Sequence, residues 1–452
     1  MSEKKDGYTA EDRMTALSSK LGIHIPEIFL PSDKTEPSNW PVIACNQYTA
    51  SPAYWDRVQK RVEGSASPSA YNIILPEIYL EEPGDVPVRE RIAQINRTMR
   101  DYYSEQVISS RGRCMVFTDR STPYTPSRKG LVFAIDLEKY DFSSGSKALI
   151  RATEGTVLER IPPRLQIRKD AGLEISHVML LADDPGDTVI GPVAADCAAG
   201  NAEILYDIQL PEGGVHVRGY RIPYESGITM DALEAMSGLR SFVEDGLLFA
   251  VGDGNHSLAT AKTHWDNIKS SCPSDHPSRY ALVELVNIYD EGLRFEPIHR
   301  VVFGVKPEEF AAFAKNRMPA ELGIETSDGM SVDNAILMAS TIDPKVQPFI
   351  AFTKDHAAVI TCNLPLSPFT AGTAQLIIDS YISSHPSARV DYIHGEDHTR
   401  ELADRGTGIL LPALHKEEFF GIIAGRGCLP RKTFSMGEAD EKRFYMECRL
   451  IV

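Results

Sequence analysis

Residues 247–262 constrain the fold more than any other part of this chain. The apolar run 247–251 is typical of a buried strand, and the helix-like segment 258–262 follows it closely. The connection contains Gly252 and Gly254, which allow the backbone a tight corner. A strand, a glycine turn and a helix start place unpaired backbone N–H groups and the positive end of a helix dipole together. The pattern predicts α/β structure with a candidate phosphate or carboxylate site at this corner.

The polar side chains of this corner suggest specific roles. Asp253 and His256 are candidates for metal binding or proton transfer. The residues expected to contact a ligand are Gly252, Gly254, Asn255 and Ser257. A purely structural corner is the alternative: Asp253 or Asn255 would cap the helix, and His256 would be a polar surface residue. Spacing alone leaves both interpretations open.

Charge and cysteine content limit the partners and the compartment. The 452 residues carry a formal net charge of -16, which opposes a general nucleic-acid surface. The seven cysteines are scattered without CxxC spacing, which suits a reducing cytosol. The N-terminus has no apolar signal core, and no stretch approaches the ~20 apolar residues of a membrane span. We expect a cytoplasmic protein with a small-molecule ligand, without nucleic-acid or membrane partners, and compatible with a homo-oligomer.

Hydrophobic patterning predicts a mixed α/β fold with a mixed-sheet core and two domains. Residues 1–25 are polar and expected to be frayed or loosely docked. Residues 26–303 hold most of the β-rich stretches and form the predicted main ligand-binding domain. The pattern changes near residue 304, so residues 304–452 are predicted to form a smaller C-terminal α/β domain packed on the first.

Several elements have clear periodicity. Apolar residues at 88, 92, 95, 99 and 102 predict an amphipathic helix, and the nearly continuous apolar run 280–289 predicts a central strand. Within residues 304–452, helices are predicted at 307–318, 370–384 and 415–425, and strands at 348–353 and 357–362.

The most basic part of the chain is residues 149–169. It contains Arg151, Thr153 and Glu154 beside a glycine, and the arginine fork binds phosphate or carboxylate bidentately. The alternative is a solvated charged helix with internal Glu–Arg pairs.

Two His–Arg pairs lie in predicted strands flanked by apolar residues: His216 with Arg218, and His299 with Arg300. Strict alternation places His216 and Arg218 on one strand face. A charge in such a position is costly unless it is paired, so each pair is either a structural group or part of a pocket shared with His256. Near the C-terminus, Lys432 and Thr433 lie in a loop that could grip a phosphate or form an exposed turn.

Seven segments occur in order along nearly the whole chain: ACNQY (44–48), ILPEIYL (74–80), RATEGTVLERIPPR (151–164), GGVHVRGYRI (213–222), VGDGNHS (251–257), LVELVNIYDEGLRFEPIHRVVF (282–303) and LPRKTFSMGEADEKRFY (429–445). With these segments the chain resembles the bacterial and archaeal family catalogued as domain of unknown function 1015.

The strand–DGxH–helix turn of that family looks like the phosphate-binding turn of the ParB/sulfiredoxin-like superfamily. That superfamily includes nucleotide-binding partition proteins, sulfiredoxin and free-serine kinases. The family pattern is Asp-Gly-His-His-Arg, whereas this chain has Asp253-Gly254-Asn255-His256-Ser257. Without the terminal arginine, the charge for a phosphate has to come from elsewhere, and Arg151, Arg218 and Lys432 are the candidates.

The preferred hypothesis is a protein that binds a nucleotide, ATP or ADP with Mg²⁺, or another phosphorylated small molecule at residues 252–257. It would act as a small-molecule kinase-like phosphotransferase. Asp253 or Glu154 would bind Mg²⁺ or accept the hydroxyl proton, and His256 would orient or protonate an oxygen. The neutralising cations would be Arg151, Arg218 and Arg300.

Two alternatives remain open at this point. One is a non-catalytic nucleotide or metabolite sensor, which the serine at position 257 favours because it replaces a phosphate-gripping arginine. The other is a metal-dependent hydrolase built from His216, His256, His299 and nearby carboxylates.

Overall fold

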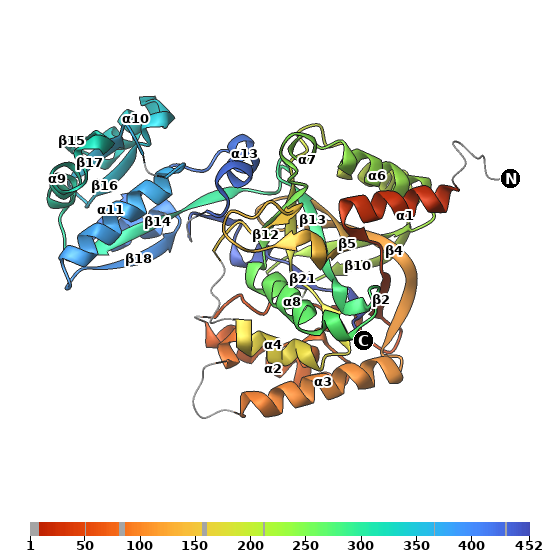
Figure 1. Ribbon diagram of the computed structural model, residues 1–452. Coiled ribbons are helices and arrows are strands. Elements are labelled where there is room, and N and C mark those ends of the chain that lie inside the picture. The colour runs from red at the N-terminus through yellow and green to blue at the C-terminus, as the bar shows by residue number, and fades with distance from the viewer. Residues whose placement is uncertain are drawn as a thin grey trace. The chain divides into compact units, whose positions relative to one another are not determined.

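The computed structural model describes residues 9–49, 51–80, 86–155, 161–210, 213–365, 367–429 and 432–452. The chain divides into two compact units (Figure 1). The first comprises Met1–Leu293, Ile423–Cys428 and Glu438–Val452, and the second Arg294–Ile422 and Leu429–Gly437. The division therefore precedes residue 304, because the strand from Phe295 to Phe303 pairs with strands of the second unit. The last residues return to the first unit, where their strands find partners.

A mixed sheet of thirteen strands, counted over the described residues, forms the centre of the first unit. Its main path runs in the order β6 (Tyr140–Asp141), β7 (Ile150–Arg151), β12 (Phe249–Asp253), β9 (Met179–Ala182), β13 (Tyr280–Asn287), β5 (Arg128–Asp136), β4 (Ile108–Ser121), β2 (Glu27–Pro31), β22 (Cys448–Leu450) and β8 (Leu173–Ile175). Off this path, β1 (Ile23–His24) pairs with β5, β11 (His216–Pro223) with β4, and β10 (Glu203–Gln209) with β11. β13 is parallel to β9 and antiparallel to β5, so the predicted mixed sheet is confirmed.

Side-chain alternation along the central strands builds a core on each face of this sheet. On β5, Leu131, Phe133 and Ile135 join one cluster of buried residues, and Val132 joins the other. The helices that cover these faces are α1 (Ala10–Leu21), α2 (Pro52–Gly64), α3 (Val88–Ser104), α4 (Ile161–Lys169), α5 (Ile190–Ala198), α6 (Gly227–Ser237), α7 (Arg240–Asp245) and α8 (Asn255–Ile268). Figure 1 shows α2 and α3 on one side of the sheet and α1 and α6 on the other. The sheet is thus covered on both faces, and its central strand β13 is buried along nearly its whole length and mostly apolar, as its sequence predicted, with Glu284 and Asn287 as its polar residues.

The predicted amphipathic helix is confirmed as α3. Ile92, Ile95, Met99 and Tyr102 are all buried, and they recur at the spacing that places them on one helix face.

The expectation of a frayed N-terminal segment is wrong for its described part. α1 begins with a capping box, in which the Asp12 amide donates to Thr9 Oγ1 (3.1 Å) and the Thr9 amide donates to Asp12 Oδ2 (2.9 Å). Met14 and Leu21 are buried in the core, and Gly22 ends the helix in the left-handed conformation. These two buried residues, the partly buried Leu17 and good caps dock a helix that is largely polar.

The second unit contains an antiparallel sheet. Its order is β15 (Ile324–Met330), β17 (Ala357–Cys362), β16 (Phe349–Phe352), β19 (Thr407–Leu410), β14 (Phe295–Phe303) and β18 (Arg389–His394), and β20 (Phe434–Met436) pairs with β14. Its helices include α9 (Pro307–Arg317), α10 (Val332–Thr341), α11 (Thr370–Ser384) and α12 (Glu396–Leu402). A further helix, α13 (Lys416–Arg426), follows β19. The helices and strands predicted between residues 304 and 425 are confirmed within a few residues.

A small two-stranded sheet joins β3 (Val42–Ile43) to β21 (Phe444–Tyr445) and holds the C-terminal segment in the first unit. Among the described helices, none has both the length and the apolar content that crossing a membrane requires.

Candidate functional site

The predicted corner between β12 and α8 begins a helix without a side-chain cap. Gly254 is the N-cap residue, its φ is 82°, and a glycine has no side chain with which to cap the helix. Neither Asp253 nor Asn255 therefore acts as the cap, which was the structural alternative. A Cβ atom on Gly254 would lie 3.0 Å from the Val178 Cα, so the position has neither the conformation nor the space for another residue. The amides of the first turn have no intrahelical acceptor and lie at the positive end of the helix dipole.

The sheet places a second predicted segment beside this corner. β7 is parallel to β12, with Ile150 opposite Phe249, so the residues after β7 run alongside the end of β12. Thr153 Oγ1 donates to the Val251 carbonyl (2.6 Å), and the Thr153 amide donates to Asn255 Oδ1 (3.3 Å). Glu154 follows and is half-buried. The structure thus brings Thr153 into contact with the corner, and Glu154 is its neighbour in the chain.

Asp253 has a cationic partner that the sequence analysis missed. Its Oδ2 lies 3.6 Å from Lys442 Nζ, and its Oδ1 accepts the Gly254 N–H (2.7 Å). Both side chains keep a solvent-facing part, with exposed fractions of 23% for Asp253 and 13% for Lys442. The corner therefore combines uncapped amides, a carboxylate and an ammonium group.

On the inner side of α8, Ser257 contacts a buried histidine. Ser257 Oγ lies 3.3 Å from His177 Nε2, and His177 Nδ1 lies 2.8 Å from the Tyr445 hydroxyl. The Cys45 amide donates to the same hydroxyl (3.3 Å). Burial lowers the pKa of His177, and the nearby Asp253 carboxylate only partly opposes this, so the ring is neutral at pH 7. This chain of contacts ties the first turn of α8 to β21.

Ser257, His177, Tyr445 and Cys45 also border a cavity of about 150 Å³. Cys45, Lys442 and Tyr445 all lie in segments that carry the family resemblance, so those segments could have indicated them as site residues. Nothing in the sequence indicated His177, because it is a lone histidine before an apolar strand.

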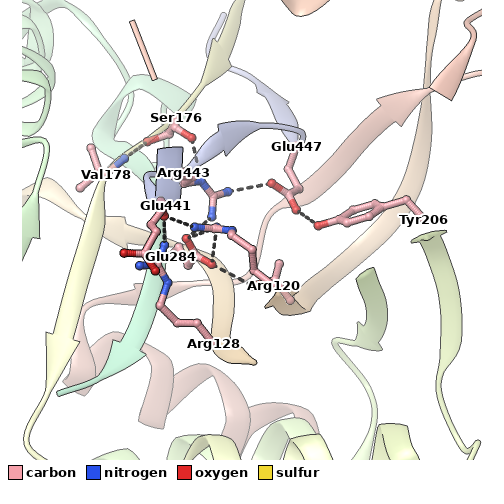
Figure 2. Close-up of polar contacts among 10 residues, drawn as sticks. Arg120, Arg128, Ser176, Val178, Tyr206, Glu284, Glu441, Arg443 and Glu447 are labelled. Carbon is pink, nitrogen blue, oxygen red and sulfur yellow. Dashed lines mark hydrogen bonds and ion pairs between the residues drawn. The ribbon is translucent and has the colours of Figure 1, made fainter. Parts of the chain in front are cut away.

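A buried network of arginines and carboxylates holds the segment that carries Lys442 and Tyr445. Figure 2 shows Glu284 of β13 at its centre, contacted by Arg443 Nη1 (2.9 Å) and Arg120 Nη2 (3.2 Å). Arg443 also pairs with Glu447 (2.7 Å), which accepts the Tyr206 hydroxyl (2.5 Å). Figure 2 also shows Arg128, Ser176 and Glu441. The Glu441 carbonyl accepts hydrogen bonds from Arg120 and Arg128, and the Ser176 carbonyl accepts one from Arg443 Nε. These contacts fix the C-terminal segment against the sheet.

Arg151 requires a correction, since its guanidinium is not available to a ligand at the corner. The residue is buried, and its Nε donates to the Ala148 carbonyl (2.8 Å). Its Nη2 lies 3.3 Å from the Asp245 carbonyl and 3.5 Å from the Gly246 carbonyl. Arg151 therefore satisfies backbone carbonyls at the end of α7 and in the loop before β7.

His216 and Arg218 also require a correction, because both pair with Asp207 on the neighbouring strand. His216 Nε2 lies 2.5 Å from Asp207 Oδ1, and Arg218 Nη2 lies 2.7 Å from Oδ2. The hydrogen bond from Arg218 lowers the pKa of Asp207. The alternation on β11 is confirmed, but these side chains form a surface ion-pair cluster rather than a pocket.

The remaining predicted site residues belong to the second unit: His299, Arg300, Lys432 and Thr433. His299 Nδ1 accepts the Leu411 amide (3.2 Å), and Arg300 Nε donates to Gln375 Oε1 (3.2 Å). Burial lowers the pKa of His299 to about 4. The site of the first unit is therefore built without them.

Within the described residues, no three His, Cys, Asp or Glu side chains are grouped so that they could hold a metal ion. His216 is engaged by Asp207. The hydrolase alternative thus loses one of its three histidines.

Comparisons with known proteins give one family and several distant structures. No curated protein matches this chain. Among solved structures, a conserved hypothetical protein from Pyrococcus furiosus shares 10% identity, with 70% of this chain and 94% of that chain covered and a TM-score of 0.34. A free serine kinase in complex with AMP shares 11% identity, with 70% and 90% covered and a TM-score of 0.35. SbnI with a C-terminal truncation, from Staphylococcus aureus, shares 11% identity, with 70% and 85% covered and a TM-score of 0.34.

The family model described as "Protein of unknown function (DUF1015)" matches residues 29–367, which is well over half of the chain. The match runs through the β12–α8 corner and the whole β13 strand. This chain belongs to the DUF1015 family.

Proposed function

We propose that this protein binds the phosphate group of a small molecule at the first turn of α8, and that nucleotides are the leading ligands to test. The uncapped helix start at Gly254 is the observation that carries this proposal. Helix N-termini that follow a strand and a glycine turn bind phosphate through backbone amides and the helix dipole. The resemblance of this turn to the ParB/sulfiredoxin-like phosphate-binding turn points in the same direction.

The residues around the corner have distinct parts in this proposal. The amides of Asn255, His256 and Ser257 would hold phosphate oxygens, and Lys442 would supply the cation that the sequence analysis sought among the arginines. A phosphate beside Asp253 and Glu154 would meet like charge unless a cation intervened. Carboxylate oxygens are the ligands that Mg²⁺ prefers, so either Asp253 or Glu154 fits the holding of a nucleotide's Mg²⁺.

A phosphotransferase is the catalytic form of this proposal. The carboxylate of the pair Asp253 and Glu154 that does not hold the metal would accept the proton of a small polar acceptor. His256 would orient an oxygen, and the metal would offset charge on the phosphates. The non-catalytic form is a sensor, which would bind the same ligand without turnover. The replacement of the family arginine by Ser257 favours the sensor, and the Asp253–Lys442 pair favours the enzyme.

Binding is measured by titration calorimetry with inorganic phosphate, AMP, ADP and ATP, each with and without Mg²⁺. Lys442→Gln should weaken binding roughly tenfold or more, because a charged hydrogen bond is worth about 1.5–3 kcal/mol. Lys354→Gln is the matched control, since Lys354 is an exposed lysine of the second unit. Phosphorus NMR with a panel of small alcohols then separates transfer from binding alone. The absence of any binding at millimolar ligand would contradict the proposal.

A further inference from the structure

The cavity beside α8 has mostly apolar walls and room for a small molecule. Its volume is about 150 Å³, and it lies among α4, α8, β8 and the residues before α3. Its apolar wall includes Met99, Ile167, Leu173, Leu258, Leu282 and Ile451. A cavity of about 150 Å³ with apolar walls accommodates benzene, so the apolar body of a ligand, a ring or branched chain of about six heavy atoms, fits here.

One cavity-lining side chain, Arg168 of α4, has buried donors without acceptors. Its Nη1 lies 2.6 Å from Glu174 Oε1. Its Nε and Nη2 are buried, and no residue in the described ranges accepts a hydrogen bond from either atom. An unsatisfied buried donor costs about 1–3 kcal/mol, and more when it is charged. Nε and Nη2 form one edge of the planar guanidinium, and two parallel donors on such an edge match the two oxygens of a carboxylate.

The charges around Arg168 leave an excess of one cation. Arg168 shares Glu174 with Arg449, whose Nε also contacts this carboxylate (2.5 Å). Among the described residues, Glu174 is the one carboxylate that forms an ion pair with Arg168 or with Arg449. Arg449 is buried, with an exposed side-chain fraction of 3%. The other ion pair of the cavity, Arg164 with Glu77, balances itself. Two guanidinium groups therefore depend on a single carboxylate.

The neighbouring histidines do not change this balance. Burial lowers the pKa of His177, and it lowers the pKa of His264 to about 4 with Arg168 contributing, so both rings are neutral at pH 7. A buried water could accept a hydrogen bond from Arg168 but would leave the positive charge uncompensated. A phosphate monoester carries a charge of about −1.5 to −2, which is larger than the single positive charge that is left uncompensated here.

We propose that this cavity binds a small monocarboxylate with an apolar body, its carboxylate on the Nε–Nη2 edge of Arg168 and its body against the apolar wall. The observations that carry the proposal are the unsatisfied guanidinium edge, the unbalanced charge and the cavity itself. None of them depends on phosphate binding at the corner.

Benzoate is the probe, and benzyl alcohol, which has the same ring and lacks one oxygen and the charge, is its neutral counterpart. Calorimetry and thermal shift on the full chain should show benzoate binding at least tenfold more tightly than benzyl alcohol. Arg168→Gln should abolish this preference and leave the weak binding of benzyl alcohol unchanged. Arg168→Lys retains the charge but loses the planar fork, and it should weaken benzoate binding by a smaller factor.

Ala261→Leu tests the cavity separately, because Ala261 is buried on α8 and lines it. The added carbons should prevent binding of both probes. Thr263→Leu, half-buried on the same helix and outside the lining, is the matched control and should bind benzoate normally. Melting temperatures and circular dichroism verify that each variant is folded. Equal binding of the two probes by the wild type, or benzoate binding that survives both Arg168→Gln and Ala261→Leu, would overturn the proposal.

Discussion

Glu284→Gln should destabilise the first unit more than any surface charge substitution. The Glu284 side chain is 4% exposed and lies 2.9 Å from Arg443 and 3.2 Å from Arg120. The Thr118 hydroxyl donates to it as well (2.8 Å). Burial alone would raise the pKa of Glu284, but the surrounding guanidinium groups hold it well below its usual range. Glutamine has nearly the same shape but removes the negative charge, and its NH₂ group faces arginines that can only donate.

The expected loss follows from the burial of the arginines. Removing one partner of a buried ion pair costs about 3–5 kcal/mol, because the remaining charge is left uncompensated in a low dielectric. With an m-value of about 3 kcal/mol/M, this loss lowers the urea midpoint by roughly 1 M or more. Glu447 still pairs with Arg443, which places the expected value toward the lower end of that range.

Urea unfolding followed by tryptophan fluorescence and circular dichroism measures this loss. Trp40, Trp55 and Trp265 all lie in the first unit, so fluorescence reports on the unit that contains Glu284. Glu234→Gln is the matched control: its partner is Arg13, the two side chains are 50% and 51% exposed, and the change should cost less than about 1 kcal/mol. If Glu284→Gln and Glu234→Gln shifted the midpoint equally, the network would not hold the C-terminal segment as argued.

Acidification provides a second test of the same interaction. The pKa of Glu284 is lower in the folded than in the unfolded protein, so its contribution is complete above the unfolded pKa of about 4.3. It decreases as the pH falls below that value. The difference in stability between wild type and Glu284→Gln should therefore be constant near neutral pH and become smaller below about pH 4. A difference that grew on acidification would refute the assignment.

Two further predictions concern the corner and His24. Gly254→Ala should lower the free energy of unfolding by about 1–2 kcal/mol because of the left-handed backbone alone, and by more because the added Cβ approaches Val178. It should also abolish phosphate binding. Melting temperature checks the loss of stability, and calorimetry checks the loss of binding. Burial lowers the pKa of His24 to about 4, so the unfolded protein binds more protons below pH 6.5 and stability should fall as the pH drops from 6.5 toward 4. His24→Gln should make that decline in urea midpoints less steep, and an unchanged pH profile would contradict the burial argument.

Local patterns in the sequence were sufficient for the elements of the fold. The spacing of Ile92, Ile95 and Met99 predicted one buried face of α3, and a nearly continuous apolar run predicted the central strand β13. The corner at Gly254 was predicted as well, since a strand, a glycine turn and a helix start are all encoded by neighbouring residues. Such features depend on burial and backbone conformation within one segment, which periodicity and glycine placement express directly.

The partners of the charged residues were decided by the tertiary structure. Arg151 and Arg218 were predicted at the phosphate site, but strand pairing gives Arg218 to Asp207, and chain packing gives Arg151 to backbone carbonyls. Conversely, Lys442 reaches Asp253 because the chain leaves the first unit at residue 294 and returns at its C-terminus. The sequence determined which segments are helix, strand and turn. The strand order and the returning C-terminal segment determined which distant side chains meet at the corner. A charged side chain pairs with an opposite charge that lies close to it in space, and local sequence patterns do not encode the spatial distance between residues far apart in the chain.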